Sequence, residues 1–217
     1  MNLITRESKV WWLAHSDEIR ATRGIFIADA VGRLAKEFQF AGVPTALPPP
    51  NEGLTFREGR MQADDKQIVI TELVIYNDGV TVRTSSTTED CDLVLERALA
   101  IGAELGLRTP ITSPVRFYQS FLVFELSKSI DRMINGHEKL FYLLEQSMHL
   151  SSSAHVASLM FSVDPDKLPK RIASINPTAF RIERRVDVPF DQNRYFSMAN
   201  TSTGTHIAIL EEIERSI

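Results

Sequence analysis

Apolar side chains recur every three or four positions in four stretches of the chain, which is the spacing of an amphipathic helix. These stretches are Asp17–Phe40, Cys91–Leu105, Ser129–Leu150 and Gly204–Ile217. The first is interrupted near Gly24. The second follows Thr87 and Asp90, which resemble a helix-capping pair, and it ends at Gly106, where a C-terminal cap is expected. The acidic residues around this cap would repel phosphate, so we interpret the segment as a helix start and not as a phosphate-binding loop.

Shorter apolar runs, many of them alternating with polar positions, predict strands. Between Leu54 and Thr84, three such runs are separated by turn signals, of which Asn77-Asp78-Gly79 is the clearest. This predicts an antiparallel three-stranded meander. The segment 114–127 is apolar on both faces and therefore predicts a central strand. Further strands are expected near 155–163, 178–190 and 194–198.

The order of these elements predicts an α+β fold, with a mostly antiparallel sheet and helices packed on it. We expect residues 1–217 to form a single α+β domain. A proline-rich crossing loop at about 41–53 has four prolines in thirteen residues, which excludes a helix there. The sequence shows no internal repeat.

Composition narrows the class of protein. The chain is 43% hydrophobic and 24% charged, as expected for a folded globular protein. A formal net charge of -4 gives no general attraction to nucleic acid, so binding of nucleic acid would need a local basic patch. The single cysteine, Cys91, excludes an intramolecular disulfide and favours a cytoplasmic location. We find no secretory signal and no apolar run long enough to cross a membrane.

Catalytic motifs are missing from the sequence. It contains no nucleophile elbow, dinucleotide fingerprint or P-loop, and its five histidines lack the spacing of a helix-borne zinc site. We therefore expect no catalytic residue, no metal and no cofactor, and we lean against an enzyme. Cys91 falls in the first turn of a predicted helix, where the dipole favours a thiolate, but it shares the apolar stripe and is better interpreted as a small core residue.

One group of basic and aromatic residues could bind an anion. On the strand beginning at Phe180, Arg181 and Arg185 share one face, and Arg194 and Tyr195 follow nearby. Guanidinium groups suit phosphate or carboxylate, and an exposed aromatic ring can stack on a base. The alternative is a solvated sheet face on which the arginines pair with acidic neighbours.

The C-terminal helix is the main candidate for a protein interface. Its apolar side is formed by four residues: Ile209, Leu210, Ile213 and Ile217. That side must pack either on the chain's own core, which is the default, or on another chain. The Trp11-Trp12 pair is a further candidate contact, because tryptophan is enriched at interface centres, but such a pair more often anchors a terminus onto its own domain.

Two functions remain open. The first is a non-enzymatic interaction or assembly subunit of a larger bacterial or viral complex, with a protein partner or a homo-oligomer. The alternative is a binder of a nucleotide, a small anionic ligand or single-stranded nucleic acid through the arginine and aromatic strand face. A membrane partner is not expected.

Overall fold

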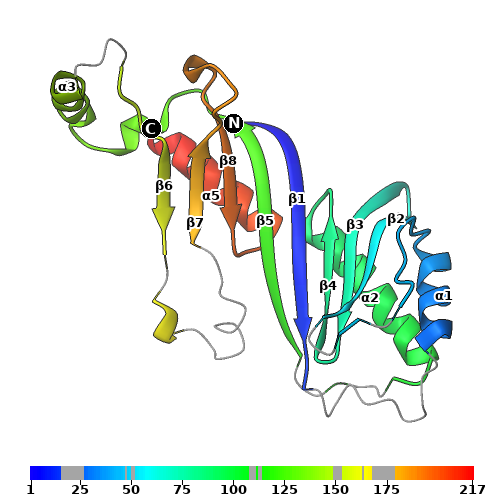
Figure 1. Ribbon diagram of the computed structural model, residues 1–217. Helices are drawn as coiled ribbons and strands as arrows, with labels where there is room; N and C mark the ends of the chain where they lie inside the picture. Colours follow the sequence, from blue (N-terminus) through cyan, green and yellow to red (C-terminus); the bar gives the residue numbers. More distant parts are fainter. Residues whose placement is uncertain are drawn as a thin grey trace.

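Eight antiparallel strands form one sheet that runs through the whole molecule (Figure 1). The computed structural model describes residues 1–15, 27–46, 48–49, 52–107, 111, 114–148, 153–162, 164–167 and 179–217. The strands are β1 (Asn2–Leu13), β2 (Leu54–Ala63), β3 (Lys66–Tyr76), β4 (Gly79–Thr84), β5 (Val115–Glu125), β6 (Ser158–Phe161), β7 (Phe180–Arg184) and β8 (Arg194–Ala199). The described α-helices are α1 (Ile27–Glu37), α2 (Thr88–Glu104), α3 (His137–Met148) and α5 (Thr203–Ser216). This confirms the predicted α+β class.

The sheet consists of two halves with the same order of described elements. The first half runs β1, α1, β2, β3, β4, α2, and the second runs β5, α3, β6, β7, β8, α5. In the sheet the strands lie in the order β2-β3-β4-β1-β5-β8-β7-β6, so the second half mirrors the first about the β1–β5 pair. The repeat that is missing from the residue pattern is therefore present in the topology.

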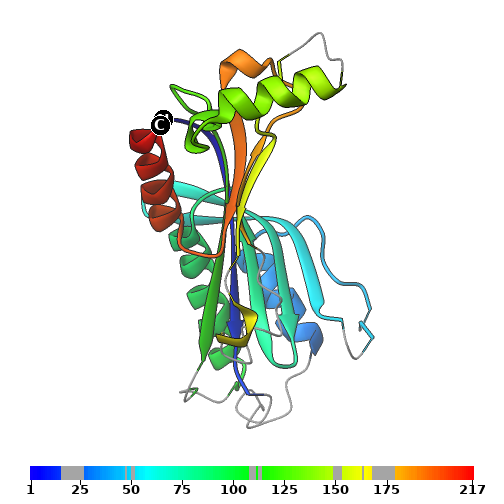
Figure 2. The ribbon, with the colours of Figure 1, turned by 90° about the vertical axis from the view of Figure 1, so that its left-hand side faces the viewer.

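A reciprocal contact marks the centre of this arrangement. The backbone N–H of Thr88 donates to Oγ1 of Thr203 at 3.0 Å, and the backbone N–H of Thr203 donates to Oγ1 of Thr88 at 2.9 Å. Mutual exchange of one contact is the mark of an approximate two-fold relation. Both threonines begin a helix, so α2 and α5 start side by side and then follow the same side of the sheet in opposite directions (Figure 2).

The apolar residues form two clusters, one in each half. In the first, Phe38, Phe56 and Ile101 are fully buried between the sheet and the helices α1 and α2. In the second, Phe124, Ile182 and Leu210 are buried among β5, β7 and α5. The two halves therefore have separate cores joined by the long β1–β5 ladder. Within the described residues, no helix has the length and apolar character needed to cross a membrane.

Several predictions are confirmed in detail. The meander is β2-β3-β4, with the Asn77-Asp78 turn before Gly79. Helix α2 is capped by the Thr87 side chain, which accepts from the backbone N–H of Asp90, and Gly106 follows the helix at φ +101°. β5 is central, between β1 and β8.

Other predictions are wrong, incomplete or outside the described residues. Residues 2–13 form a strand that the sequence pattern did not predict; within it Trp12 is buried and Trp11 is partly buried, so the pair is not an exposed surface and anchors the strand instead. The continuous helix expected over Ser129–Leu150 is divided into a 3-10 turn, Ile130–Met133, and α3, because Gly136 adopts φ +74°. The first helix begins at Ile27; the expected start near Asp17 and the interruption at Gly24 lie outside the described residues.

Candidate functional site

The arginines proposed to bind an anion each contact a neighbouring carboxylate. Nη1 of Arg181 lies 3.1 Å from Oε1 of Glu183, and Nη2 of Arg194 lies 2.7 Å from Oε1 of Glu125. Arg185 likewise lies 3.1 Å from Asp187. The hydrogen bonds from Arg194 lower the pKa of Glu125, so this carboxylate stays charged and neutralises its partner. The face is therefore a set of local ion pairs.

Tyr195 has a structural position. It is fully buried, and its hydroxyl accepts a hydrogen bond from the backbone N–H of Ile130 at 3.2 Å. Its ring packs against Phe124 with centroids 5.9 Å apart. A base can stack only on an exposed ring, so Tyr195 is not available for that role.

The C-terminal helix packs on its own core. Leu210 is fully buried, Ile217 is nearly so, and Ile213 lies against the same cluster. Ile209 is the most exposed of the four predicted interface residues, at 37%. The proposed apolar face of α5 is thus largely used within the chain.

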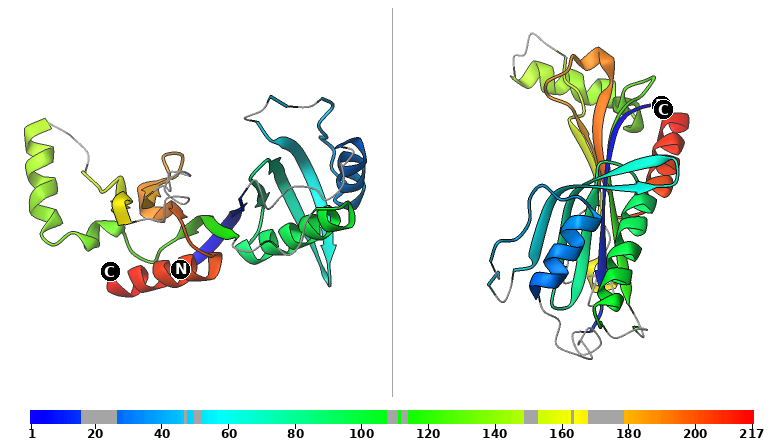
Figure 3. Two further views of the ribbon diagram at one scale, coloured as in Figure 1. Left: turned by 90° about the horizontal axis from the view of Figure 1, so that it is seen from below. Right: turned by 90° about the vertical axis from the view of Figure 1, so that its right-hand side faces the viewer.

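Helix α3 exposes an apolar surface where the sequence pattern predicts a buried side, so the predicted burial of Leu140, Leu144 and Met148 is wrong. None of its residues is buried, and five of its large side chains are between 40% and 62% exposed: Leu140, Tyr142, Leu143, Leu144 and Met148. The helix lies at one end of the molecule, opposite α1, and stands away from the sheet (Figure 3). We refer to Leu140, Leu143 and Leu144 as the α3 leucine face, because they fall within about 100° of the helix circumference.

A buried carboxylate holds the two chain segments that flank α3. Asp131 precedes the helix, and its Oδ1 accepts from the backbone N–H of Val156, which follows the helix, at 2.8 Å. Its Oδ2 lies 2.8 Å from Nδ1 of His155. Burial disfavours the charged form of Asp131, but these hydrogen bonds and one with Ser129 outweigh it and lower the pKa of the carboxyl. The two segments at the base of α3 are therefore tied together.

Arg184 completes this polar cluster from β7. Its Nη2 donates to Oγ of Ser129 at 2.9 Å and lies 3.8 Å from Asp131, while Nη1 donates to the carbonyl oxygen of Phe190 at 2.9 Å. The guanidinium also lies over the rings of Phe190 and Tyr195. A buried arginine needs such partners, so the cluster fixes the base of α3 to the sheet.

Contacts from one side of α3 hold it against the segment that follows the helix and against the second core cluster. Phe141 turns inward, where its ring lies 6.5 Å from that of His155 and packs on the second core cluster. The carboxylate of Glu145 accepts from the backbone N–H of Ala154 at 2.7 Å. These contacts hold one side of α3 and leave the leucine face outward.

The described residues contain no cluster of three or more histidine, cysteine, aspartate or glutamate side chains able to hold a metal. Cys91 is buried as predicted; its thiol donates to the carbonyl oxygen of Ser8 at 3.3 Å, and burial raises its pKa to about 12. A thiol with this pKa is not a nucleophile at neutral pH.

No model of a known protein family matches the chain, and no curated protein matches its sequence. The geometry of the molecule therefore carries the functional argument alone.

Proposed function

We propose that the protein is a non-enzymatic assembly subunit that binds a protein partner through the α3 leucine face. The observation that carries this proposal is the exposure of three leucines at i, i+3 and i+4 on a helix whose base is fixed. Amphipathic helices bind grooves of partner proteins through apolar side chains at this spacing. Large exposed apolar patches on folded chains are typical of interaction surfaces.

The first half of the molecule supports the same interpretation. Its corresponding helix, α1, buries Leu34 against the core, whereas α3 buries none of its side chains. The helix at this position in the topology thus covers a core in the first half, whereas in the second half the helix leaves its apolar side chains exposed. The open helix is the natural place for a partner to complete the fold.

The anion-binding alternative has less support. Its three arginines already contact carboxylates, and Tyr195 is in the core. We therefore do not propose it.

We expect replacement of two leucines to dissociate the assembly. The Leu140→Ser/Leu143→Ser variant removes two large apolar side chains that the partner would bury, at a cost of about 2 kcal/mol each. Association should weaken on the order of 100-fold or more. The native mass of the protein isolated from cells that produce it should fall to that of one chain.

A matched control removes equally exposed side chains elsewhere. Leu93 on α2 and Ile209 on α5 are 45% and 37% exposed, and Leu93→Ser/Ile209→Ser should leave the native mass unchanged. A wild-type protein with the mass of one chain, or dissociation by the control pair alone, would contradict the proposal. The second result would move the interface to α2 or α5.

A further inference from the structure

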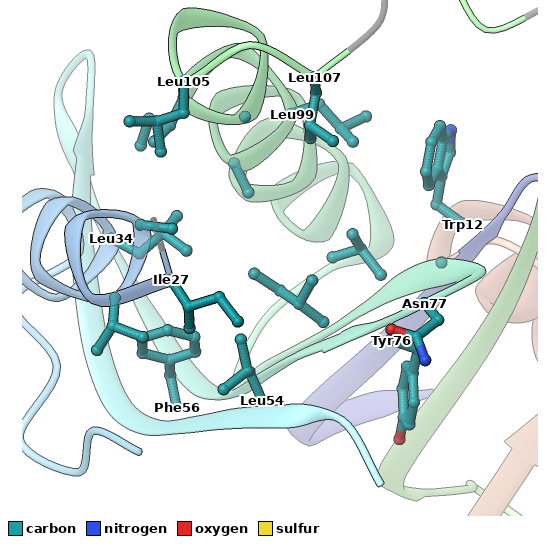
Figure 4. Close-up of a pocket in the computed structure, with 18 of the residues that line it drawn as sticks. Trp12, Ile27, Leu34, Leu54, Phe56, Tyr76, Asn77, Leu99, Leu105 and Leu107 are labelled. Atoms are coloured by element: carbon teal, nitrogen blue, oxygen red, sulfur yellow. The ribbon is translucent and has the colours of Figure 1, made fainter. Parts of the chain in front are cut away.

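The first half of the molecule contains an apolar cavity of about 460 Å³ between α1, α2 and the sheet, and this cavity is partly open to solvent (Figure 4). Leu34 of α1 and Leu99 and Leu105, on and just after α2, face it from opposite sides, and Phe56 and Trp12 face it from the sheet. The volume falls within the range of roughly 300–1,000 Å³ that is common for small-molecule sites.

Ion pairs on the outer surface hold the two helices at their present separation. Nε of Arg97 donates to Glu37 at 2.6 Å, and Nη2 of Arg33 donates to Glu104 at 2.7 Å. Each pair links α1 to α2. The helices are thus joined through their polar sides while their apolar sides face the cavity.

The lining defines the chemistry of an occupant. None of the described lining residues is charged, and their polar groups are the indole N–H of Trp12, the hydroxyl of Tyr76 and the carboxamide of Asn77. The Tyr76 hydroxyl points away from the space, and Asn77 lies in the β3–β4 turn at its rim (Figure 4). A charged group placed inside would lose its hydration without gaining a partner, which strongly disfavours it. A helix about 10 Å across is too wide for a space of this size, so a helical protein segment is also disfavoured.

We propose that this cavity binds one uncharged, predominantly apolar small molecule, with any hydrogen-bonding group directed to Asn77. The site is independent of the α3 leucine face, which lies in the other half of the molecule. The protein therefore has two separate binding surfaces, one for a protein and one for a small apolar ligand.

The test uses the uncharged fluorophore N-phenyl-1-naphthylamine and the full chain. In a Trp11→Phe background, Trp12 is the remaining tryptophan and lines the cavity. We expect saturable binding of one probe per chain, with a rise in probe emission and a parallel change in Trp12 emission.

Cavity-filling variants decide between this site and other apolar surfaces. Ala98 lines the cavity, and Ala98→Leu should weaken probe binding at least 10-fold without lowering the melting temperature. Ala30→Leu fills the space from α1 and serves as the second variant if Ala98→Leu does not fold. Ala208→Leu, at an exposed position of α5, is the control and should bind the probe as the parent does. Absence of saturable binding, or equal binding by the folded cavity variants and the control, would overturn the proposal.

Discussion

Replacement of Asp131 by alanine should destabilise the protein by about 3–5 kcal/mol, the usual cost of removing one partner from a buried ion pair. The carboxylate is the acceptor for His155 and for the backbone N–H of Val156, and it lies beside the buried guanidinium of Arg184. Without it, the buried backbone N–H of Val156 and the buried guanidinium of Arg184 lose a partner, and the more exposed His155 loses its hydrogen bond. The free energy of unfolding, measured with urea at pH 7, checks this expectation.

Asp187→Ala provides the matched control. Asp187 also contacts an arginine, Arg185 at 3.1 Å, but both side chains are largely exposed. Exposed pairs contribute about 0–1 kcal/mol, so this variant should unfold nearly as the wild type does. If Asp131→Ala and Asp187→Ala cost the same, the base of α3 does not depend on the buried cluster.

Acidification should lower the free energy of unfolding, because His206 is buried in its neutral form. Nε2 of this fully buried histidine lies 2.8 Å from Oγ of Ser197, which itself donates to the carbonyl oxygen of Arg181. The Ser197 oxygen therefore accepts from Nε2–H, and Nδ1 has no partner among the described residues. Protonation would place a second N–H in the core without an acceptor, and burial lowers the pKa of His206 from 6.5 to about 4.

The sign of the effect follows from this depressed pKa. Above pH 6.5 the ring is neutral in both states, whereas between pH 6.5 and 4 the unfolded chain binds a proton that the folded protein excludes. Stability attributable to His206 is thus lost as pH falls, by about 3 kcal/mol in full. When the free energy of unfolding is measured with urea at pH 7 and at pH 4.5, it should fall less between the two for His206→Gln than for wild type. His15→Gln, at an exposed position, is the control; equal losses in all three proteins would contradict the account.

Local sequence signals predict the parts of the fold whose contacts are local. The Asn77-Asp78-Gly79 turn and the Thr87 cap specify the meander and α2, because turn and cap chemistry depend on adjacent residues. The sequence did not predict β1, because apolar and polar residues alternate only weakly in its first half. Ile4 is exposed although it is apolar, and Ser8 is buried against α2 and α5 although it is polar. Its burial is set by β4 and β5, which are distant in the sequence.

The candidate site was less accessible to sequence reasoning. Leu140 and Leu144 have the spacing of a core-facing stripe, and the spacing does not reveal whether a core lies opposite. Asp131 and Arg184 belong to separate elements, and the β5–β8 and β7–β8 pairings bring them together. The signal that could have been used is Gly136, which interrupts the helical stretch and allows α3 to leave the sheet.

Cys91 and His206 show why the repeated topology is hidden in the sequence. Each lies three residues after the first threonine of its helix, and both are fully buried near the contact between Thr88 and Thr203. The Cys91 thiol bonds to a backbone carbonyl oxygen, and Nε2 of His206 bonds to a serine hydroxyl. Different side chains thus occupy equivalent places in the two halves.

Photo-cross-linking from α3 tests the central claim most directly. The photoreactive residue p-benzoylphenylalanine is placed at position 143 in cells that produce the protein, and at Leu93, of similar exposure, as the control. We predict one discrete protein adduct from position 143 and none from position 93, and the adduct's mass identifies a second copy or another chain. No discrete adduct from position 143, or the same adduct from both positions, would contradict a role for the α3 leucine face in assembly.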